Sequence, residues 1–226
     1  MTELLYIDEE PAQGNMVLRA AVESGFFGKA GVDTARPLAD IDEMIDFILE
    51  SKCKVLISDY RLGEKMLGIS YTGLELIETF RRRFDGFPCF LITNFVGDAL
   101  NEHVEVNMIF PKSDLKATKN KSELPFFHRV RAKIEERDVV LVEKSDRFQY
   151  LQERMTTAGL GAVEMQELLD LDDFLEGAIN KADSVPRLLK ERALQPFDRL
   201  IETAEKLVEK IELELSASRT EADKND

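Results

Sequence analysis

Short apolar runs alternate with amphipathic stretches along residues 1 to about 137. The apolar runs fall at residues 4–7, 31–35, 54–58, 88–93 and 108–110. Between them, apolar residues recur at the spacing of three and four positions that places them on one face of a helix. This alternation is typical of βαβ units, in which helices cover both faces of a parallel sheet. We therefore predict an α/β domain with five strands and five helices.

Several residues suggest where the helices begin and end. Pro11 can open the first helix and Gly25 can end it. Asp40 and Thr72 are suitable N-caps for the second and third helices, because their side chains can accept hydrogen bonds from the first turn. Residues 60–71 have mixed polarity and include two glycines, which indicates a long loop. Two further helices are predicted, at residues 97–103 and 123–137.

The pattern changes after residue 137. Residues 138–143 read as another strand, and helices are predicted at residues 147–157 and 171–181, with a turn at Gly159 and Gly161 between them. We therefore expect residues 138–215 to form an acidic α/β segment that ends in a long helix. Residues 216–226 are polar and are expected to be a disordered tail.

The long C-terminal helix is expected to start near Ser184 and Pro186. Its apolar residues follow the three–four spacing of a coiled coil or a helical hairpin, at Phe197, Leu200, Ala204, Leu207 and Ile211. This seam could join two copies of the chain in a homodimer, or it could pack back on the same chain. The sequence leaves these two alternatives open.

Composition narrows the class of protein. The 226 residues are 44% hydrophobic, enough for a real core, and 44 acidic against 30 basic residues give a formal net charge of −14. Because this charge repels phosphate backbones and anionic membranes, we expect no nucleic-acid partner. No apolar stretch approaches the length that a bilayer requires, so no membrane partner is expected either. Cys53 and Cys89 lack metal-site spacing and are predicted to be reduced core thiols, which indicates a cytoplasmic protein.

Four of the predicted strands end on residues suited to phosphoryl chemistry. Asp8 and Glu9 follow the first strand, and Asp59 follows the third. Thr93 ends the fourth strand and Lys112 follows the fifth. Ligands of an open parallel sheet bind outside the carboxyl ends of its strands, so these side chains are expected to share one site.

The three carboxylates would repel one another unless a hard divalent cation balances them. Mg²⁺ takes oxygen ligands and retains water or phosphate oxygens, so it is the expected ion. One carboxylate can then act as a nucleophile toward phosphorus. The Lys112 ammonium and the Thr93 hydroxyl can stabilise the negative phosphoryl oxygens.

Five short motifs together resemble the receiver domain of two-component response regulators. In chain order they are Ile7-Asp8-Glu9-Glu10-Pro11, Leu56-Ile57-Ser58-Asp59, Gly73-Leu74-Glu75-Leu76-Ile77, Leu91-Ile92-Thr93 and Phe110-Pro111-Lys112. The resemblance covers residues 1–137. It implies a flavodoxin-like five-stranded parallel sheet of order 2-1-3-4-5, followed here by a C-terminal α/β and helical extension.

The resemblance also implies a role for each site residue. Asp59 would accept a phosphoryl group from a histidine kinase or a phosphotransfer protein. Asp8, Glu9, Asp59 and the backbone carbonyl of Arg61 would hold Mg²⁺, while Thr93 and Lys112 would sense the phosphoryl group. The chain would not be an enzyme for external substrates, and it would signal to a downstream effector protein through protein–protein contacts.

Three residues depart from the receiver pattern. Ser113 stands where a proline after a cis peptide bond is usual, and Asn94 stands where a small residue is usual. Ile109 replaces the aromatic residue that often acts as a rotameric switch, with Phe110 beside it as a candidate substitute. The chemical part of a receiver is therefore present, while the residues that transmit its state differ.

Two other functions fit the same residues. The chain could be a pseudo-receiver, a scaffold that works without phosphorylation. It could also be a magnesium-dependent phosphohydrolase that uses the carboxylates to turn over a small phosphate ester. Arg61 and Phe95 flank the expected pocket, and we hypothesise that their bulk shields the acyl phosphate from water.

Overall fold

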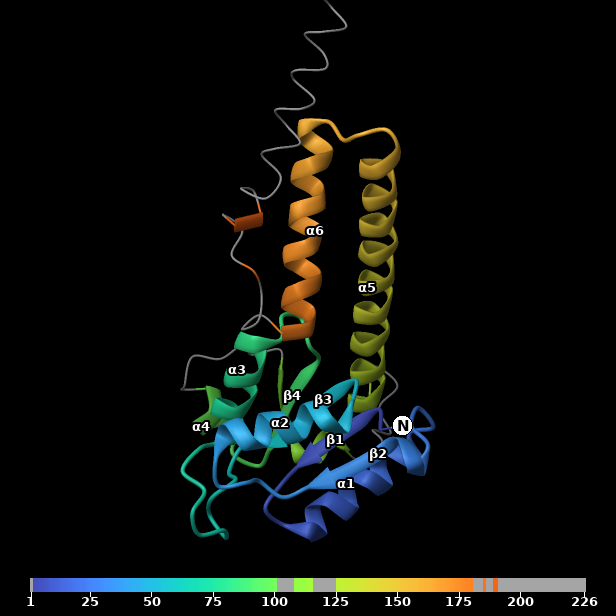
Figure 1. Ribbon diagram of the computed structural model, residues 1–226. Coiled ribbons are helices and arrows are strands. Elements are labelled where there is room, and N and C mark those ends of the chain that lie inside the picture. The colour runs from blue at the N-terminus through green and yellow to red at the C-terminus, as the bar shows by residue number, and fades with distance from the viewer. Residues whose placement is uncertain (1, 101–107, 116–124, 181–184, 186–188, 191–226) are drawn as a thin grey trace, which may run out of the picture.

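A computed structural model describes residues 2–100, 108–115, 125–180, 185 and 189–190 (Figure 1). Five parallel strands form one sheet in the order β2-β1-β3-β4-β5, which confirms the predicted flavodoxin-like fold class. The strands are β1 (Leu4–Ile7), β2 (Val32–Ala35), β3 (Val55–Asp59), β4 (Cys89–Thr93) and β5 (Ile109–Pro111). The helices are α1 (Pro11–Glu23), α2 (Ile41–Ser51), α3 (Gly73–Arg83), α4 (Val96–Leu100), α5 (Phe126–Thr157) and α6 (Ala162–Asn180), and 3-10 turns are η1 (Lys29–Gly31) and η3 (Lys112–Leu115).

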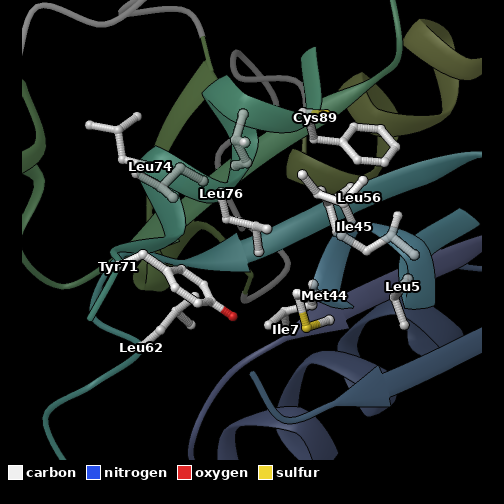
Figure 2. Packing of buried hydrophobic residues seen from close by; sticks show 14 of the residues in the cluster. Leu5, Ile7, Met44, Ile45, Leu56, Leu62, Tyr71, Leu74, Leu76 and Cys89 are labelled. Carbon is white, nitrogen blue, oxygen red and sulfur yellow. The ribbon is translucent and has the colours of Figure 1, made fainter. Parts of the chain in front are cut away.

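Alternate residues of each strand face opposite layers of helices. Leu5 and Leu56 pack with α2 and α3 in one apolar cluster, part of which Figure 2 shows. Their neighbours Tyr6 and Ile57 pack with α1 and the first turns of α5 in a second cluster. Because both faces are covered, the central strands are apolar throughout, and this explains why short apolar runs predicted the sheet well.

The predicted helix caps are confirmed. The Asp40 carboxylate accepts hydrogen bonds from the backbone N–H groups of Asp42 and Glu43 at 2.7 and 3.2 Å. Thr72 and Glu75 form a reciprocal capping box at the start of α3. Gly25 has a φ of +78° just after α1, the left-handed conformation that ends many helices.

The strand predicted at residues 138–143 is wrong, because these residues lie inside the 32-residue helix α5. The two helices predicted at residues 123–137 and 147–157 are joined in this one helix, which begins at Phe126. No glycine or proline interrupts Phe126–Thr157, so nothing in the backbone ends the helix. The run Val139-Val140-Leu141-Val142 resembled a strand, but Val139 and Val142 are 55% and 59% exposed on the outer side of the helix.

Helices α5 and α6 form an antiparallel hairpin that projects from the sheet (Figure 1). The predicted turn is confirmed, since Gly159 has a φ of +77° between the two helices. Near this turn the helices share a small apolar cluster that includes Leu151 and Leu168. The described residues thus give a helical extension, and its predicted α/β character is not found.

The base of the hairpin is tied to the sheet domain. The Asp85 N–H donates to the Gly177 carbonyl at 2.9 Å, and Arg137 donates to the Ala178 carbonyl at 3.2 Å. Lys54, just before β3, pairs with Asp138 at 2.5 Å. The expected domain boundary at 137/138 therefore falls within α5, at the point where this helix leaves the sheet domain.

Other predictions fall partly outside the described residues. Helix α6 begins nine residues before the helix predicted at 171–181. The apolar seam from Phe197 to Ile211 and the tail 216–226 lie outside the described residues, so they stay predictions. Among the helices that the structure describes, none is long and apolar enough to cross a bilayer.

Candidate functional site

The four strand ends meet at the carboxyl edge of the sheet, as predicted. Asp8 follows β1, and Asp59 and Thr93 are the last residues of β3 and β4. Lys112 follows β5 directly. Parallel pairing aligns Ile7 with Ser58, Asp59 with Ile92 and Thr93 with Pro111, so neighbouring strands end at nearly the same level.

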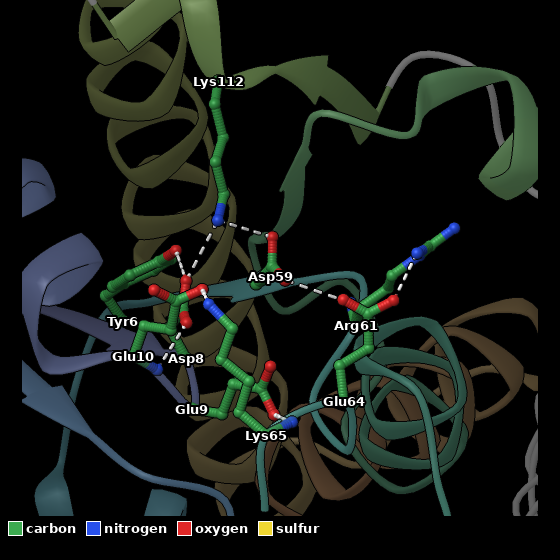
Figure 3. A network of polar contacts seen from close by, with 9 residues as sticks. All are labelled: Tyr6, Asp8, Glu9, Glu10, Asp59, Arg61, Glu64, Lys65 and Lys112. Atoms are coloured by element: carbon green, nitrogen blue, oxygen red, sulfur yellow. Dashed lines mark hydrogen bonds and ion pairs between the residues drawn. The ribbon is translucent and has the colours of Figure 1, made fainter.

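Lys112 bridges the two central aspartates (Figure 3). Its Nζ lies 2.8 Å from Asp59 Oδ1 and 3.1 Å from Asp8 Oδ2, and its side chain is only 10% exposed. The other Asp8 oxygen accepts the Glu10 N–H at 2.8 Å, and the other Asp59 oxygen accepts the Arg61 N–H at 3.1 Å. Both carboxylates are therefore held in fixed orientations around one ammonium group.

Burial and the contacts between Lys112 and the two aspartates shift the pKa values of Asp59 and Lys112. Burial raises the pKa of Asp59, and the opposing effect of Lys112 does not cancel this increase. Burial alone would lower the pKa of Lys112, but its contacts with Asp59 and Asp8 outweigh that effect and the pKa is raised. Lys112 thus stays a cation, as a group that neutralises phosphoryl oxygens must.

Tyr6 is a member of the site that the sequence did not suggest. Its hydroxyl donates to Asp8 Oδ2, the same oxygen that contacts Lys112. Burial first, and then the Asp8 charge, raises the pKa of Tyr6, so the phenol stays protonated and remains a donor. Within an apolar strand run, a tyrosine gives no sequence signal for this role.

Thr93 is fully buried, and its hydroxyl accepts the Phe95 N–H at 3.0 Å. Beside it, the Arg61 guanidinium carbon lies 3.4 Å from the centre of the Phe95 ring. The same guanidinium pairs with Glu64 and, at 2.9 Å, with Asp98. The predicted flanking pair Arg61 and Phe95 therefore exists as a stack that joins the β3–α3 loop to the β4–α4 loop.

Glu9 does not join the other two carboxylates. It is 6% exposed, and its Oε2 accepts the Lys65 N–H at 2.6 Å (Figure 3). The Lys65 ammonium also reaches the pocket, where it pairs with Glu10 at 2.5 Å and lowers the pKa of that carboxyl group. A sequence signal existed for Lys65, since it lies in the long loop that follows Asp59.

The donor set fits Mg²⁺ in its chemistry. Asp8 and Asp59 supply carboxylate oxygens that already face one cationic group, and Glu9 and the Arg61 carbonyl can supply further hard oxygens. The oxygens of Asp8, Glu9 and Asp59 do not all lie within 4.8 Å of one another, however. Among the described residues, only Asp172, Asp173 and Glu176 form such a group. The three predicted carboxylate ligands are therefore not gathered at one point, and Glu9 is turned toward Lys65 (Figure 3).

The departures from the receiver pattern have structural consequences. Ile109 packs in the cluster beneath α3, whereas Phe110 lies on the opposite face of the sheet against Phe90 and Phe126. Strand alternation thus prevents Phe110 from occupying the place of Ile109. The peptide bond before Ser113 is trans, and Asn94 is exposed.

No protein-family model and no curated protein matches the chain. Among solved structures, it is similar to the anti-anti-sigma factor PhyR from Bartonella quintana, with 15% identity and a TM-score of 0.41. This match covers 64% of the chain and 51% of PhyR, so the chain spans about half the length of that protein.

Two structures of the response regulator RcsB are also similar. The RcsB–DNA complex has 17% identity and a TM-score of 0.37, over 79% of this chain and 90% of that chain. RcsB from Salmonella typhimurium has 16% identity and a TM-score of 0.36, over 79% and 91%. Similarity at this level assigns no function to the chain. The observed strand order is the one that the receiver resemblance implied.

Proposed function

We propose that this chain is a response-regulator-like signalling protein that accepts a phosphoryl group on Asp59. The observation that carries the proposal is the Lys112 ammonium, which lies within 3.1 Å of both Asp8 and Asp59 at the carboxyl edge of the sheet. Two buried carboxylates on one lysine leave a negative balance that suits a bound divalent cation.

In the proposed reaction, an Asp59 carboxylate oxygen attacks the phosphorus of a phosphohistidine on a partner kinase or phosphotransfer protein. An O–P bond forms, the P–N bond breaks, and the imidazole leaves with the electron pair of that bond and takes up a proton. Mg²⁺, when bound by Asp8, Glu9, Asp59 and the Arg61 carbonyl, would neutralise charge on the phosphoryl oxygens. Lys112 stabilises the same developing charge from the other side, and the buried Thr93 is the candidate sensor of the product.

Incubation with acetyl phosphate and Mg²⁺, followed by intact-protein mass spectrometry, tests the proposal. We expect one phosphoryl adduct on the full chain and none on Asp59→Asn. Asp46→Asn is the matched control, because Asp46 is an exposed carboxylate on α2 and should leave the adduct unchanged. If neither acetyl phosphate nor a cognate kinase produces an adduct, phosphorylation at Asp59 is excluded.

A phosphorylation-independent scaffold is the second candidate. It is favoured by the placement of Ile109 and Phe110, which leaves no aromatic side chain at the usual switch position. A folded chain without an adduct would support it. Sustained release of phosphate from generic phosphoesters would instead support the magnesium-dependent phosphohydrolase.

The output partners follow from the same proposal. A downstream effector protein would recognise the phosphorylated state, and the seam from Phe197 to Ile211 could join two copies of the chain. Light scattering during size-exclusion chromatography, with and without a phosphoryl mimic, would detect a dimer, and a monomer in both states would exclude the dimer switch. The cytoplasmic location and the absence of a nucleic-acid partner, expected from cysteine usage and charge, stay predictions.

A further inference from the structure

The loop between β3 and α3 is compact at its neck and exposed at its tip. Leu62 is 1% exposed, and the Tyr71 hydroxyl donates to the Leu38 carbonyl at 2.6 Å. A Cβ on Gly63 would lie 2.8 Å from the Ile69 carbonyl oxygen, so the two arms of the loop touch through their backbones. Leu67 is fully exposed between them. The loop is therefore a closed Ω-like unit whose tip can move while its base stays anchored.

Lys65, near the tip of this loop, contacts the carboxylates of Glu9 and Glu10, which follow β1. Its N–H donates to Glu9 Oε2 at 2.6 Å and its ammonium pairs with Glu10 at 2.5 Å. Figure 3 shows Glu9 turned toward Lys65, while Asp8 and Asp59 turn toward Lys112. The loop thus explains why the three expected metal ligands are not gathered at one point.

The two lysines differ in their freedom to leave the pocket. Lys112 is 10% exposed and is held by two aspartates, whereas the Lys65 side chain is 61% exposed. A divalent cation that enters between Asp8 and Asp59 repels both ammonium groups and attracts the Glu9 carboxylate as a further oxygen ligand. Displacement of Lys65 removes the more weakly held of the two ammonium groups and releases Glu9 at the same time.

We propose that Lys65 and its loop gate the metal site. Binding of Mg²⁺ to the pocket frees Glu9 from the Lys65 amide and moves residues 63–68 away from Glu9 and Glu10. The inference rests on the proposed function, because it uses the same metal ligands. By linkage, a closed loop weakens metal binding by the same factor by which the metal opens the loop.

Hydrogen exchange with mass spectrometry on the full chain, with and without MgCl₂, measures the opening directly. We expect amide exchange in peptides that cover residues 63–70 to become faster with Mg²⁺, because the Lys65 N–H loses its acceptor. Peptides that cover β3 should not exchange faster. Slower or unchanged exchange in the loop at saturating Mg²⁺ would overturn the gate.

Calorimetric titration with MgCl₂ measures how strongly the Lys65 charge opposes Mg²⁺ binding. Lys65→Gln keeps the backbone N–H that contacts Glu9 but removes the side-chain charge. It should tighten Mg²⁺ binding about fivefold, the effect in water of one unit charge about 8 Å from a divalent cation. Lys133→Gln is the matched control, because it removes the same charge from a 52% exposed lysine on α5 and should leave the affinity unchanged.

The variant Asp59→Asn distinguishes a failure of the proposed metal site from a failure of the proposed gate. If Mg²⁺ binding is lost in Asp59→Asn but is equal in Lys65→Gln and the unaltered chain, the metal site stands and the gate is wrong. If Asp59→Asn binds Mg²⁺ as the unaltered chain does, the proposed metal site fails and the gate fails with it.

Discussion

At Gly73, the absence of a side chain lets α3 begin directly against the end of β3. A Cβ at this position would lie 1.7 Å from the Asp59 carbonyl oxygen and 2.5 Å from Ser58 Oγ. The Gly73 N–H donates to the Tyr60 carbonyl at 2.8 Å, which keeps the two segments together. This single residue therefore helps to place the backbone of the proposed phosphoacceptor.

We predict that Gly73→Ala destabilises the chain by about 3 kcal/mol, because a methyl group must displace backbone that is packed on both sides. Urea unfolding followed by circular dichroism measures the change. Gly28→Ala is the control, since nothing lies within 4 Å of its Cβ and its φ of −76° suits alanine. Equal stability of the two variants would contradict the close contact at Gly73.

The Phe95 ring stacks against the Arg61 guanidinium, whose carbon lies 3.4 Å from the ring centre. Arg61 also pairs with Asp98 on α4. If the stack shields an acyl phosphate on Asp59, Phe95→Ala should hydrolyse it about fivefold faster, which corresponds to the loss of about 1 kcal/mol of cation–π stacking. Phosphate release after removal of the donor measures the rate. Phe26→Ala is the control, because it removes another exposed aromatic ring. An unchanged hydrolysis rate in Phe95→Ala would show that the stack does not shield the site.

Among the elements, helix α5 shows most clearly how tertiary packing decides between strand and helix. Residues on its inner side recur at helical spacing, with Leu141, Phe148 and Leu151 wholly or partly buried. Exposed charged residues such as Lys133 and Glu136 pair along the same helix. The apolar run 139–142 is only one turn of this helix, so its β-branched residues do not determine the local structure.

We predict opposite effects for two substitutions in α5. Leu151→Ala removes a fully buried side chain and should cost about 2–5 kcal/mol of unfolding free energy. Val142→Ala should be neutral or slightly stabilising, because Val142 is 59% exposed and alanine is the better helix former. Urea titration of helical circular dichroism compares them. A clear loss of stability in Val142→Ala would instead favour the strand that the sequence suggested.

The sheet and most of the pocket could be predicted from the sequence because their signals are local. Buried parallel strands are apolar runs, and the residue after each run lies at the carboxyl edge, which placed Asp8, Asp59, Thr93 and Lys112 correctly. The hairpin and the position of Glu9 could not be predicted in this way. They depend on contacts between distant segments, such as that between Lys65 and Glu9. No periodic pattern of residues in a single sequence predicts such contacts.

The pocket and the hairpin lie at opposite edges of the sheet. The pocket is at the carboxyl edge, while the hairpin joins the domain beside Lys54 and Asp85, just before the starts of β3 and β4. Helix α5 packs on the sheet through Phe126 and Ile134 and then continues into the hairpin. An influence of phosphorylation on the hairpin would therefore have to pass through the sheet or through α5.

Lys190 contacts three carboxylates of α6. Its ammonium lies 2.6, 2.7 and 2.8 Å from carboxylate oxygens of Asp172, Asp173 and Glu176, and its side chain is 9% exposed. Burial alone would lower the pKa of Lys190, but the three carboxylates outweigh burial and raise it. In the unfolded chain the pKa returns to about 10.4. The contribution of Lys190 to stability is thus fully present below that pH and is lost as the pH rises through the folded value.

We therefore predict that Lys190→Met unfolds more easily than the unaltered chain at pH 7 and pH 9, by the same amount at both. This difference should shrink above about pH 10.4, because the lysine of the unfolded chain then loses its proton while the folded lysine keeps it. Urea unfolding of both proteins at each pH, followed by helical circular dichroism, measures the difference. Lys133→Met has one partner, Glu136, and a 52% exposed side chain, so its effect should be small at every pH. A difference for Lys190→Met that is absent at pH 7, or that does not decrease at high pH, would show that the ion pairs of Lys190 with α6 do not stabilise the chain.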